Sequence, residues 1–197
     1  MKAVVFHKPG DMRVEEVADP KIENPQDIIL RVTSTAICGS DLHIYNGLMP
    51  QPKPMVMGHE FMGVVEETGG EVRALRTGDR VVVPFPACGG CFFCQIGLPG
   101  HCENSNPKKY GPEGGLLDEK GGGLFGYTDL YGGYPGGQSE YVRVPYANFV
   151  CEKFRSNSKT RRFFSLPIFF RRVIPLSIGQ DSKAVKLWPY SDAVRWV

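Results

Sequence analysis

Four closely spaced cysteines carry the strongest chemical pattern in this 197-residue chain. They stand at C-x2-C-x2-C-x7-C, as Cys88, Cys91, Cys94 and Cys102. The residues between them include Gly89, Gly90, Gly97 and Gly100, which should let the backbone wrap around one small ion. Four thiolates at about 2.3 Å suit Zn²⁺ and leave no coordination position for a substrate. Disulfides and an iron–sulfur cluster are the alternatives, and the pattern favours a structural zinc site.

A second group of potential metal ligands lies upstream of the cysteines. Cys38 opens the string CGSDLH, and His59 and Glu60 stand in GHEFMGVVEETG. A single cysteine or histidine usually has a structural role. Here, however, Gly39 follows Cys38 and Gly58 precedes His59, so no neighbouring side chain should crowd the backbone beside either ligand. One thiolate, one imidazole and one carboxylate form an open zinc set with room for water or substrate.

Two further polar residues follow Cys38 closely. Ser40 is two residues and His43 five residues beyond the cysteine. A hydroxyl and an imidazole this close to a metal could carry a proton away from it. The pattern therefore predicts proton transfer beside the open site.

The sequence pattern predicts that the segments which position these residues are mainly β-strands. Short runs rich in apolar or alternating residues, separated by Gly and Pro, predict a closed or sandwich-like β unit and not alternating strands and helices. We predict a long glycine-rich loop over 104–137. The expected strands are Lys2–Phe6, Met12–Val17, Asp27–Ile37, Phe61–Glu67, Arg80–Val83 and Ser139–Val144.

Composition and charge narrow the class of protein. With 42% hydrophobic and 22% charged residues, the chain lies in the soluble globular range, and no apolar run is long enough to cross a bilayer. The first ten residues lack a signal-peptide core, so we expect a cytoplasmic protein. Residues 1–152 carry 13 Lys+Arg against 19 Asp+Glu, whereas residues 153–197 carry 10 against 2, and 23 of the 24 glycines precede Cys151.

The metal motifs together resemble those of the zinc-containing medium-chain alcohol dehydrogenases. The resemblance rests on CGSDLH, GHEFMGVVEETG, the turn TGDRVVV and the four-cysteine lobe, and it covers about residues 1–153. The strings PACGGCFFCQIGLPGHCENSNP and GGQSEYVRVPYANF are most similar to the glutathione-independent formaldehyde dehydrogenase and formaldehyde dismutase branch. The resemblance implies a mainly β, GroES-like catalytic domain with a four-cysteine zinc lobe, which in the family precedes a Rossmann domain holding NAD.

The resemblance also implies roles for the residues named above. Cys38 and His59 would be catalytic zinc ligands, with Glu60 an alternative ligand or a carboxylate behind them. Ser40 would take the alcohol proton, and His43 would relay it to solvent. The four lobe cysteines would hold a second, structural Zn²⁺. Family members are homo-oligomers that act on small alcohols or aldehydes, so we expect no nucleic-acid or membrane partner.

The chain departs from the family after residue 153. The third catalytic ligand and the G-x-G-x-x-G fingerprint are absent there, so the Rossmann domain is missing as written. When the third base of each codon is read with the first two of the next, residues 187–197 can give V-A-V-L-G-C-G-P-V-G, a strand leading into that fingerprint. In the same frame, residues 165–174 can give L-A-D-I-F-P-T-G-Y, which resembles the family segment carrying the third ligand.

We therefore predict a GroES-like zinc-binding catalytic domain over residues 1–152 and a frameshifted, poorly ordered tail over 153–197. The chain would be the catalytic-domain fragment of a zinc-dependent, NAD-linked oxidoreductase, inactive by itself. Two alternatives are a zinc-ribbon module that binds nucleic acid through its basic tail and a non-catalytic zinc-bound scaffold.

Overall fold

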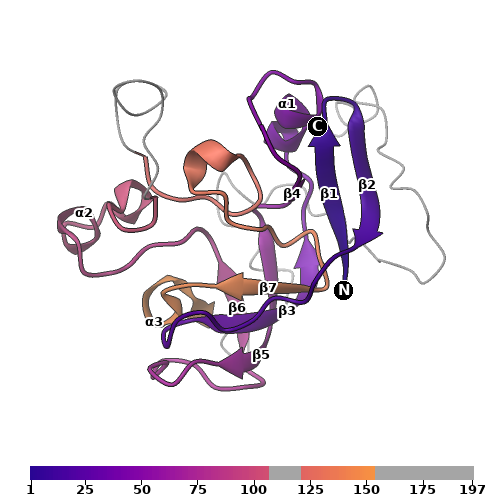
Figure 1. The fold of residues 1–197 in the computed structure, drawn as a ribbon. Coiled ribbons are helices and arrows are strands. Elements are labelled where there is room, and N and C mark those ends of the chain that lie inside the picture. Colours follow the sequence, from indigo (N-terminus) through magenta and orange to yellow (C-terminus); the bar gives the residue numbers. More distant parts are fainter. Residues whose placement is uncertain (107–120, 154–197) are drawn as a thin grey trace, which may run out of the picture.

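The computed structural model describes residues 1–106 and 121–153, which form two antiparallel sheets (Figure 1). The smaller sheet has the order β2-β1-β4, from β1 (Lys2–Lys8), β2 (Asp11–Glu16) and β4 (Met55–Val56). The larger sheet has the order β7-β3-β5-β6-β8, from β3 (Ile28–Thr35), β5 (Phe61–Thr68), β6 (Arg80–Val83), β7 (Tyr141–Val144) and β8 (Glu152–Lys153).

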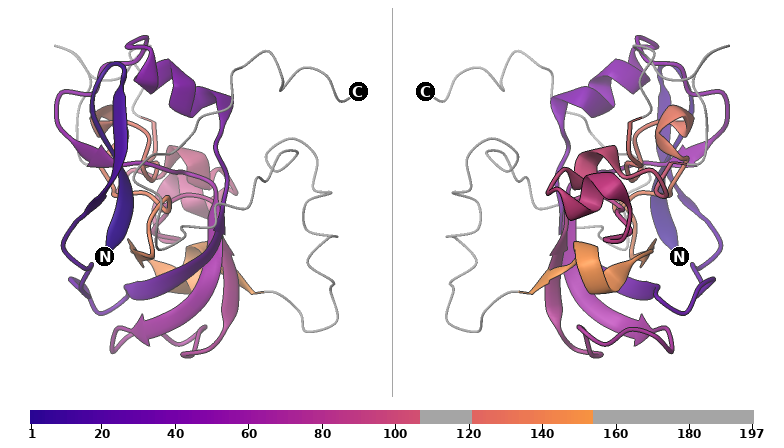
Figure 2. Two further views of the ribbon diagram at one scale, coloured as in Figure 1. Left: turned by 90° about the vertical axis from the view of Figure 1, so that its right-hand side faces the viewer. Right: turned by 90° about the vertical axis from the view of Figure 1, so that its left-hand side faces the viewer.

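Helices are short and few in the described residues. They are α1 (Gly39–Tyr45), α2 (Phe92–Gln95) and α3 (Ala147–Val150), with 3₁₀ turns at Pro99–His101 and Asp129–Tyr131. The segment with α2 projects from one side of the molecule in Figure 1, and α1 lies at the upper end in both views of Figure 2. The mainly β architecture confirms the predicted fold class. None of the described helices is long and apolar enough to cross a membrane.

All six predicted strands are present, with small differences at their ends. β3 stops at Thr35 and not at Ile37, because the chain turns there toward α1. β7 begins at Tyr141, while Ser139 instead makes an isolated bridge to Ala3. The prediction missed β4 and β8, since two residues are too few to show an alternating pattern.

Two clusters of buried hydrophobic side chains join the sheets to the cysteine lobe and to α1. The larger one joins buried side chains of β3, β5, β6 and β7 to the lobe residues Cys94 and Cys102, so the four-cysteine segment packs on the sheet core. The smaller cluster sets Ile44 of α1 against Phe6 of β1 and Met57. Burial of Ile44 therefore anchors α1 over the smaller sheet.

The register between β3 and β5 determines what lies beside the end of β3. These strands run antiparallel, with Thr35 opposite Phe61. The backbone N–H of Ala36 donates to the carbonyl of Glu60 at 2.9 Å, which extends the pairing by one step. Residues that follow β3 are thus brought next to residues that precede β5.

Two earlier predictions fall largely outside the described residues. The expected tail over 153–197 is described only at Lys153, which pairs in β8 with Val81 of β6. The glycine-rich loop is described outside 107–120, and its part from residue 121 includes the bridge between Phe125 and Tyr134. The domain boundary and the frameshift remain predictions.

Candidate metal centres

The four lobe cysteines converge as their spacing predicts. Their sulfurs all lie within 4.8 Å of one another. The sulfurs of Cys91 and Cys102 are 3.9 Å apart, close to the roughly 3.8 Å that a tetrahedron with 2.3 Å zinc–sulfur bonds requires. None of the six cysteines is in a disulfide in this structure. The donor set and its geometry fit a closed tetrahedral metal site.

Hydrogen-bond donors point at the lobe sulfurs. The Cys88 sulfur accepts from the Gly90 backbone N–H at 3.4 Å and from the Asn104 side-chain amide at 3.2 Å. Burial raises the pKa of the Cys88 thiol, but these donors outweigh it and lower the pKa to about 6. Burial and contacts with Cys91 and Cys102 raise the pKa of Cys94 to about 12. A dication placed among the sulfurs would favour the thiolate form of Cys94 against both burial and the neighbouring sulfurs.

Glycine is required at two of the four lobe positions where we expected it. Gly89 and Gly97 have φ of 74° and 80°, which favour glycine. At Gly89 a Cβ would also lie 2.7 Å from the ring of Phe149. A Cβ at Gly90 or Gly100 would meet open space, so the surroundings do not require glycine at those two positions.

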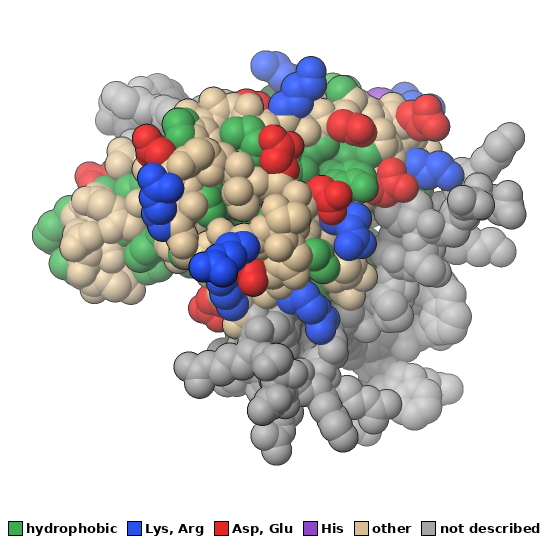
Figure 3. Space-filling view, turned by 90° about the horizontal axis from the view of Figure 1, so that it is seen from below, with side chains coloured by type: hydrophobic (Ala, Val, Ile, Leu, Met, Phe, Trp, Pro, Cys, Tyr) green, Lys and Arg blue, Asp and Glu red, His purple; other side chains and the backbone are tan. Residues whose placement is uncertain are grey.

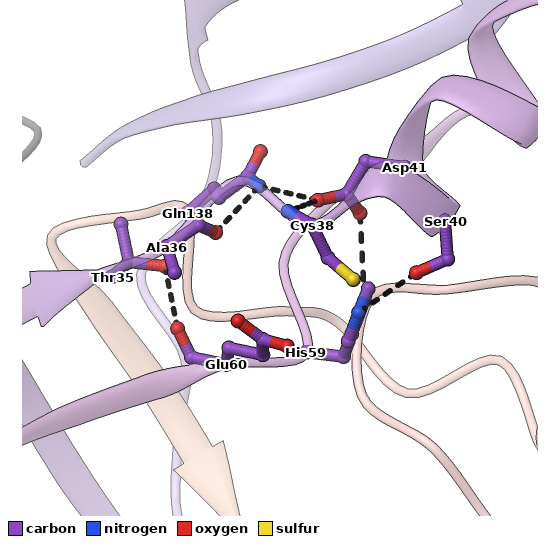
Figure 4. Close-up of polar contacts among 8 residues, drawn as sticks. All are labelled: Thr35, Ala36, Cys38, Ser40, Asp41, His59, Glu60 and Gln138. Atoms are coloured by element: carbon purple, nitrogen blue, oxygen red, sulfur yellow. Dashed lines mark hydrogen bonds and ion pairs between the residues drawn. The ribbon is translucent and has the colours of Figure 1, made fainter. Parts of the chain in front are cut away.

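The second group gathers at the point where β3 and β5 meet α1. One ligand atom each from Cys38, His59 and Glu60 lies within 4.8 Å of the other two. Cys38 is the N-cap of α1, while His59 and Glu60 immediately precede β5 (Figure 4). The antiparallel pairing of the two strands therefore assembles this group. Three ligands leave room for another molecule, unlike the four sulfurs of the lobe.

The electrostatics of this group suit a cation. Contact with His59 lowers the pKa of the Cys38 thiol, against the effect of burial. Burial raises the pKa of Glu60, and the nearby Asp41 carboxylate adds to this, while His59 and Cys38 oppose it. A positive charge placed between the two groups would stabilise both the Cys38 thiolate and the partly buried Glu60 carboxylate.

Asp41 belongs to this site but escaped the sequence analysis. Its Oδ2 accepts from the backbone N–H of Cys38 at 2.8 Å, and its Oδ1 lies 3.4 Å from Nδ1 of His59. The Oδ1–Nδ1 contact lacks hydrogen-bond geometry, and neither buried atom has a hydrogen-bond partner within the described part of the chain. Burial opposes protonation of His59, but contacts with Asp41 and Cys38 raise the pKa of the ring to about 10.

The position of Asp41 fixes which ring nitrogen faces the ligand group. With Nδ1 turned to the carboxylate, Nε2 of His59 is left for Cys38, Ser40 and any bound metal. The only sequence signal for Asp41 is its place three residues after the helix N-cap. That resembles a capping box, but Cys-x-x-Asp departs from the usual Ser/Thr-x-x-Glu/Gln pattern.

The two predicted proton carriers occupy different surroundings. The Ser40 hydroxyl lies 3.0 Å from Nε2 of His59, so it is part of the ligand group's surroundings. His43 is exposed in the last turn of α1, outside the group. Their roles in proton transfer remain predictions.

Of the two glycines beside these ligands, only Gly58 is required by its environment. It has a φ of 104°, and a Cβ there would lie 2.6 Å from the backbone nitrogen of Gln138. A Cβ at Gly39 would meet open space, so the surroundings do not require glycine there.

Comparison with known families decides the class of this fold. Residues 24–153 match the alcohol dehydrogenase GroES-like domain. The chain belongs to this family. Its GroES-like domain carries both ligand groups, and the family is one of zinc-type alcohol and formaldehyde dehydrogenases, which are oxidoreductases.

Several relatives are longer than this chain. It is 50% identical over 152 residues to the uncharacterized zinc-type alcohol dehydrogenase-like protein AdhB of Bacillus subtilis, covering 76% of this chain and 38% of that protein. It is 42% identical over 155 residues to glutathione-independent formaldehyde dehydrogenase of Pseudomonas aeruginosa, covering 75% and 36%.

A solved structure agrees with the fold. Alcohol dehydrogenase TADH from Thermus sp. ATN1 is similar with a TM-score of 0.70 and 37% identity, covering 82% of this chain and 42% of that one. The chain therefore spans less than half the length of each protein compared. One of these relatives, the glutathione-independent formaldehyde dehydrogenase, carries the name of the branch that the sequence indicated.

Proposed function

We propose that this GroES-like domain is the zinc-binding catalytic part of an NAD-linked alcohol or aldehyde oxidoreductase. In this proposal, Cys38 and His59 bind the catalytic zinc, and Glu60 is an alternative ligand or stands behind them. The four lobe cysteines bind a structural zinc. By itself the 197-residue chain is inactive, because it has neither the third ligand nor the dinucleotide fingerprint.

The observation that carries the proposal is the contrast between the two ligand groups. The lobe offers four thiols of one kind, close together and packed on the sheet core. The other group offers sulfur, nitrogen and oxygen, with the buried Asp41 behind its histidine. Closed all-sulfur sites stabilise folds, whereas open mixed sites with an oriented histidine perform chemistry.

Each residue of the open group has a part in this chemistry. When bound, zinc would act as a Lewis acid that makes the hydroxyl of an alcohol more acidic. Asp41 holds the His59 ring in one orientation, so that Nε2 is presented to the ligand group. Ser40 Oγ lies beside that nitrogen and accepts the proton released by the substrate. His43, exposed on α1, passes the proton to solvent.

The nucleic-acid alternative finds little support in the described domain. On the face seen from below, acidic and basic side chains are interspersed and do not form a basic patch (Figure 3). A phosphate-binding surface gathers Lys and Arg on one face. The family match likewise favours the oxidoreductase.

Zinc content of the purified chain tests the proposal. We expect two zinc ions per chain in the wild type and one in His59→Ala, because removal of the imidazole leaves only a thiol and a carboxylate. His7→Ala is the matched control, since His7 pairs with Glu15 on the smaller sheet, away from both groups, and should leave two zinc ions. One zinc in the wild type, or two in His59→Ala, would contradict the proposal.

A further inference from the structure

Gln138 is a buried polar residue that the proposed mechanism does not use. It lies in the segment that leads into β7, and only 4% of its surface is exposed. Its backbone N–H donates to the carbonyl of Met57 at 2.9 Å, and its carbonyl accepts from the N–H of Val4 at 2.8 Å. The backbone of Gln138 is therefore fixed both to the smaller sheet and to the segment just before His59.

The side-chain amide of Gln138 contacts residues next to the ligand group. Its Nε2 donates to the carbonyl of Ala36 at 3.2 Å and to Oδ2 of Asp41 at 3.2 Å (Figure 4). Both contacts are with the segment around Cys38. An apolar side chain could fill the same space without the cost of burying an amide, so these two hydrogen bonds are what the glutamine contributes.

The two carboxylate oxygens of Asp41 therefore make different contacts. Oδ2 accepts from Gln138 and from the backbone N–H of Cys38, at 3.2 and 2.8 Å. Two donors on one oxygen prevent rotation of the carboxylate, and the other oxygen, Oδ1, is left facing Nδ1 of His59 at 3.4 Å. Without the amide, Oδ2 would keep one of its two donors in the described residues, the backbone N–H of Cys38, and the carboxylate could turn away from the imidazole.

We infer that Gln138 is a positioning residue for the Cys38–His59 metal site. It locks the Asp41 carboxylate, which in turn orients the His59 ring so that Nε2 faces the metal. The inference rests on the proposed function, since it requires that these residues bind a metal. Loss of such an outer partner typically lowers metal affinity about 10–100-fold.

Cadmium-113 NMR of the full 197-residue chain tests this inference, because each bound Cd²⁺ gives its own resonance. The wild type should show one resonance from the four-sulfur lobe and a second from the mixed site. In Gln138→Met, which keeps the approximate volume and removes the amide, the second resonance should shift and its cadmium affinity fall about 10–100-fold. The lobe resonance should not change, and it reports that the variant is folded.

Two further variants make the test specific. Gln26→Met is the matched control, because Gln26 is exposed and its amide donates to Glu71 at 3.4 Å, away from both ligand groups. Both resonances should therefore stay as in the wild type. Gln138→Glu keeps the shape of the side chain, sets a carboxylate against Asp41, and decides the matter if Gln138→Met does not fold. It should weaken cadmium at the mixed site and spare the lobe.

The outcomes separate this inference from the function on which it rests. A second resonance with wild-type position and affinity in a folded Gln138→Met or Gln138→Glu chain would overturn the positioning role and leave the proposed function standing. Absence of the second resonance from the wild type would overturn both.

Discussion

Cys38 and Cys91 are both cysteines at helix N-caps, yet their sulfurs have different neighbours. Cys91 lies among three other cysteine sulfurs in a segment attached to the sheet core. Cys38 lies beside an imidazole and a carboxylate. The first environment is chemically closed once a metal is bound, and the second accepts a further ligand. The neighbours, not the residue type, separate a structural site from a reactive one.

Replacement of Cys91 tests the structural role. Cys91→Ser should abolish zinc binding in the lobe and destabilise the domain strongly, because a closed zinc site contributes folding free energy of about 10–16 kcal/mol in small peptides. Zinc analysis and thermal unfolding with and without a chelator measure both effects. Cys151→Ser removes a thiol outside both ligand groups and should retain the full zinc content. Unchanged zinc in Cys91→Ser would contradict the lobe assignment.

The sequence predicted the direct ligand candidates but not the residues behind them. Cys38 and His59 stand in short strings whose residue types identify their chemistry. Asp41 and Gln138 are ordinary polar residues, and Gln138 lies 97 positions beyond Asp41, so their contact is known only from the folded structure. Partners of this kind depend on tertiary packing and leave no local pattern in a single sequence.

At the scale of elements, the pairing of β3 with β5 aligns the open site. Val32 stands opposite Gly63, next to a register shift in β3. A Cβ on Gly63 would lie 2.2 Å from the carbonyl oxygen of Arg31 and 2.9 Å from Cγ of Leu30. The two strands can approach this closely only because that position has no side chain. The same pair of strands leads to Cys38, which follows β3, and to His59, which precedes β5.

Gly63→Ala should therefore weaken both the fold and the open site. Forcing a methyl group against a backbone carbonyl typically costs about 1–3 kcal/mol, and spreading β3 from β5 would separate the two ligands. The midpoint of urea unfolding measures the first effect, and the affinity of the mixed site for Cd²⁺ measures the second.

Gly70→Ala is the matched control for this prediction. A Cβ there would meet open space, so its effect should stay within about 0.5 kcal/mol. Equal unfolding midpoints for the two alanine variants would show that the strands accommodate the methyl group and that the register does not depend on Gly63.

The strands that carry this alignment were predictable, whereas their pairing was not. β3 and β5 are rich in β-branched and apolar residues, which indicate strands from local sequence alone. The order β7-β3-β5-β6-β8 brings together residues that are far apart in the chain. Periodicity cannot specify that order, and the family resemblance predicted only the fold class, so the order of the strands came from the structure.

At the scale of the whole molecule, the change of composition near residue 152 coincides with the end of the family match. The match ends at residue 153, where β8 lies on the edge of the larger sheet beside β6. Lys153 still contributes to this edge, with its Nζ 2.7 Å from Oδ2 of Asp79. Beyond it, the sequence has 9 Lys+Arg against 2 Asp+Glu, so the basic excess lies outside the matched region.

A measurement of dinucleotide binding tests whether residues 154–197 are frameshifted. A cofactor site of this family needs a strand that delivers glycines to a helix N-terminus, where backbone N–H groups meet the pyrophosphate. Gly179 is the only glycine after Cys151, so the sequence as written cannot supply that turn. We expect no saturable binding when the purified 197-residue chain is titrated with NAD.

A shift of one nucleotide near codon 153 should reverse this result. In that frame Trp188-Pro189 must encode Ala and Trp196-Val197 must encode Gly, which is the last glycine of the fingerprint. The codons between them allow the other two glycines directly after an apolar strand. A frame-restored protein continued by its downstream coding sequence should bind NAD, because its backbone can then approach the pyrophosphate. Fluorescence titration of both proteins, with zinc content as the control for folding of the GroES-like domain, separates the two readings. Saturable micromolar binding by the 197-residue chain would mean that residues 154–197 work as written and that the frameshift reading is false.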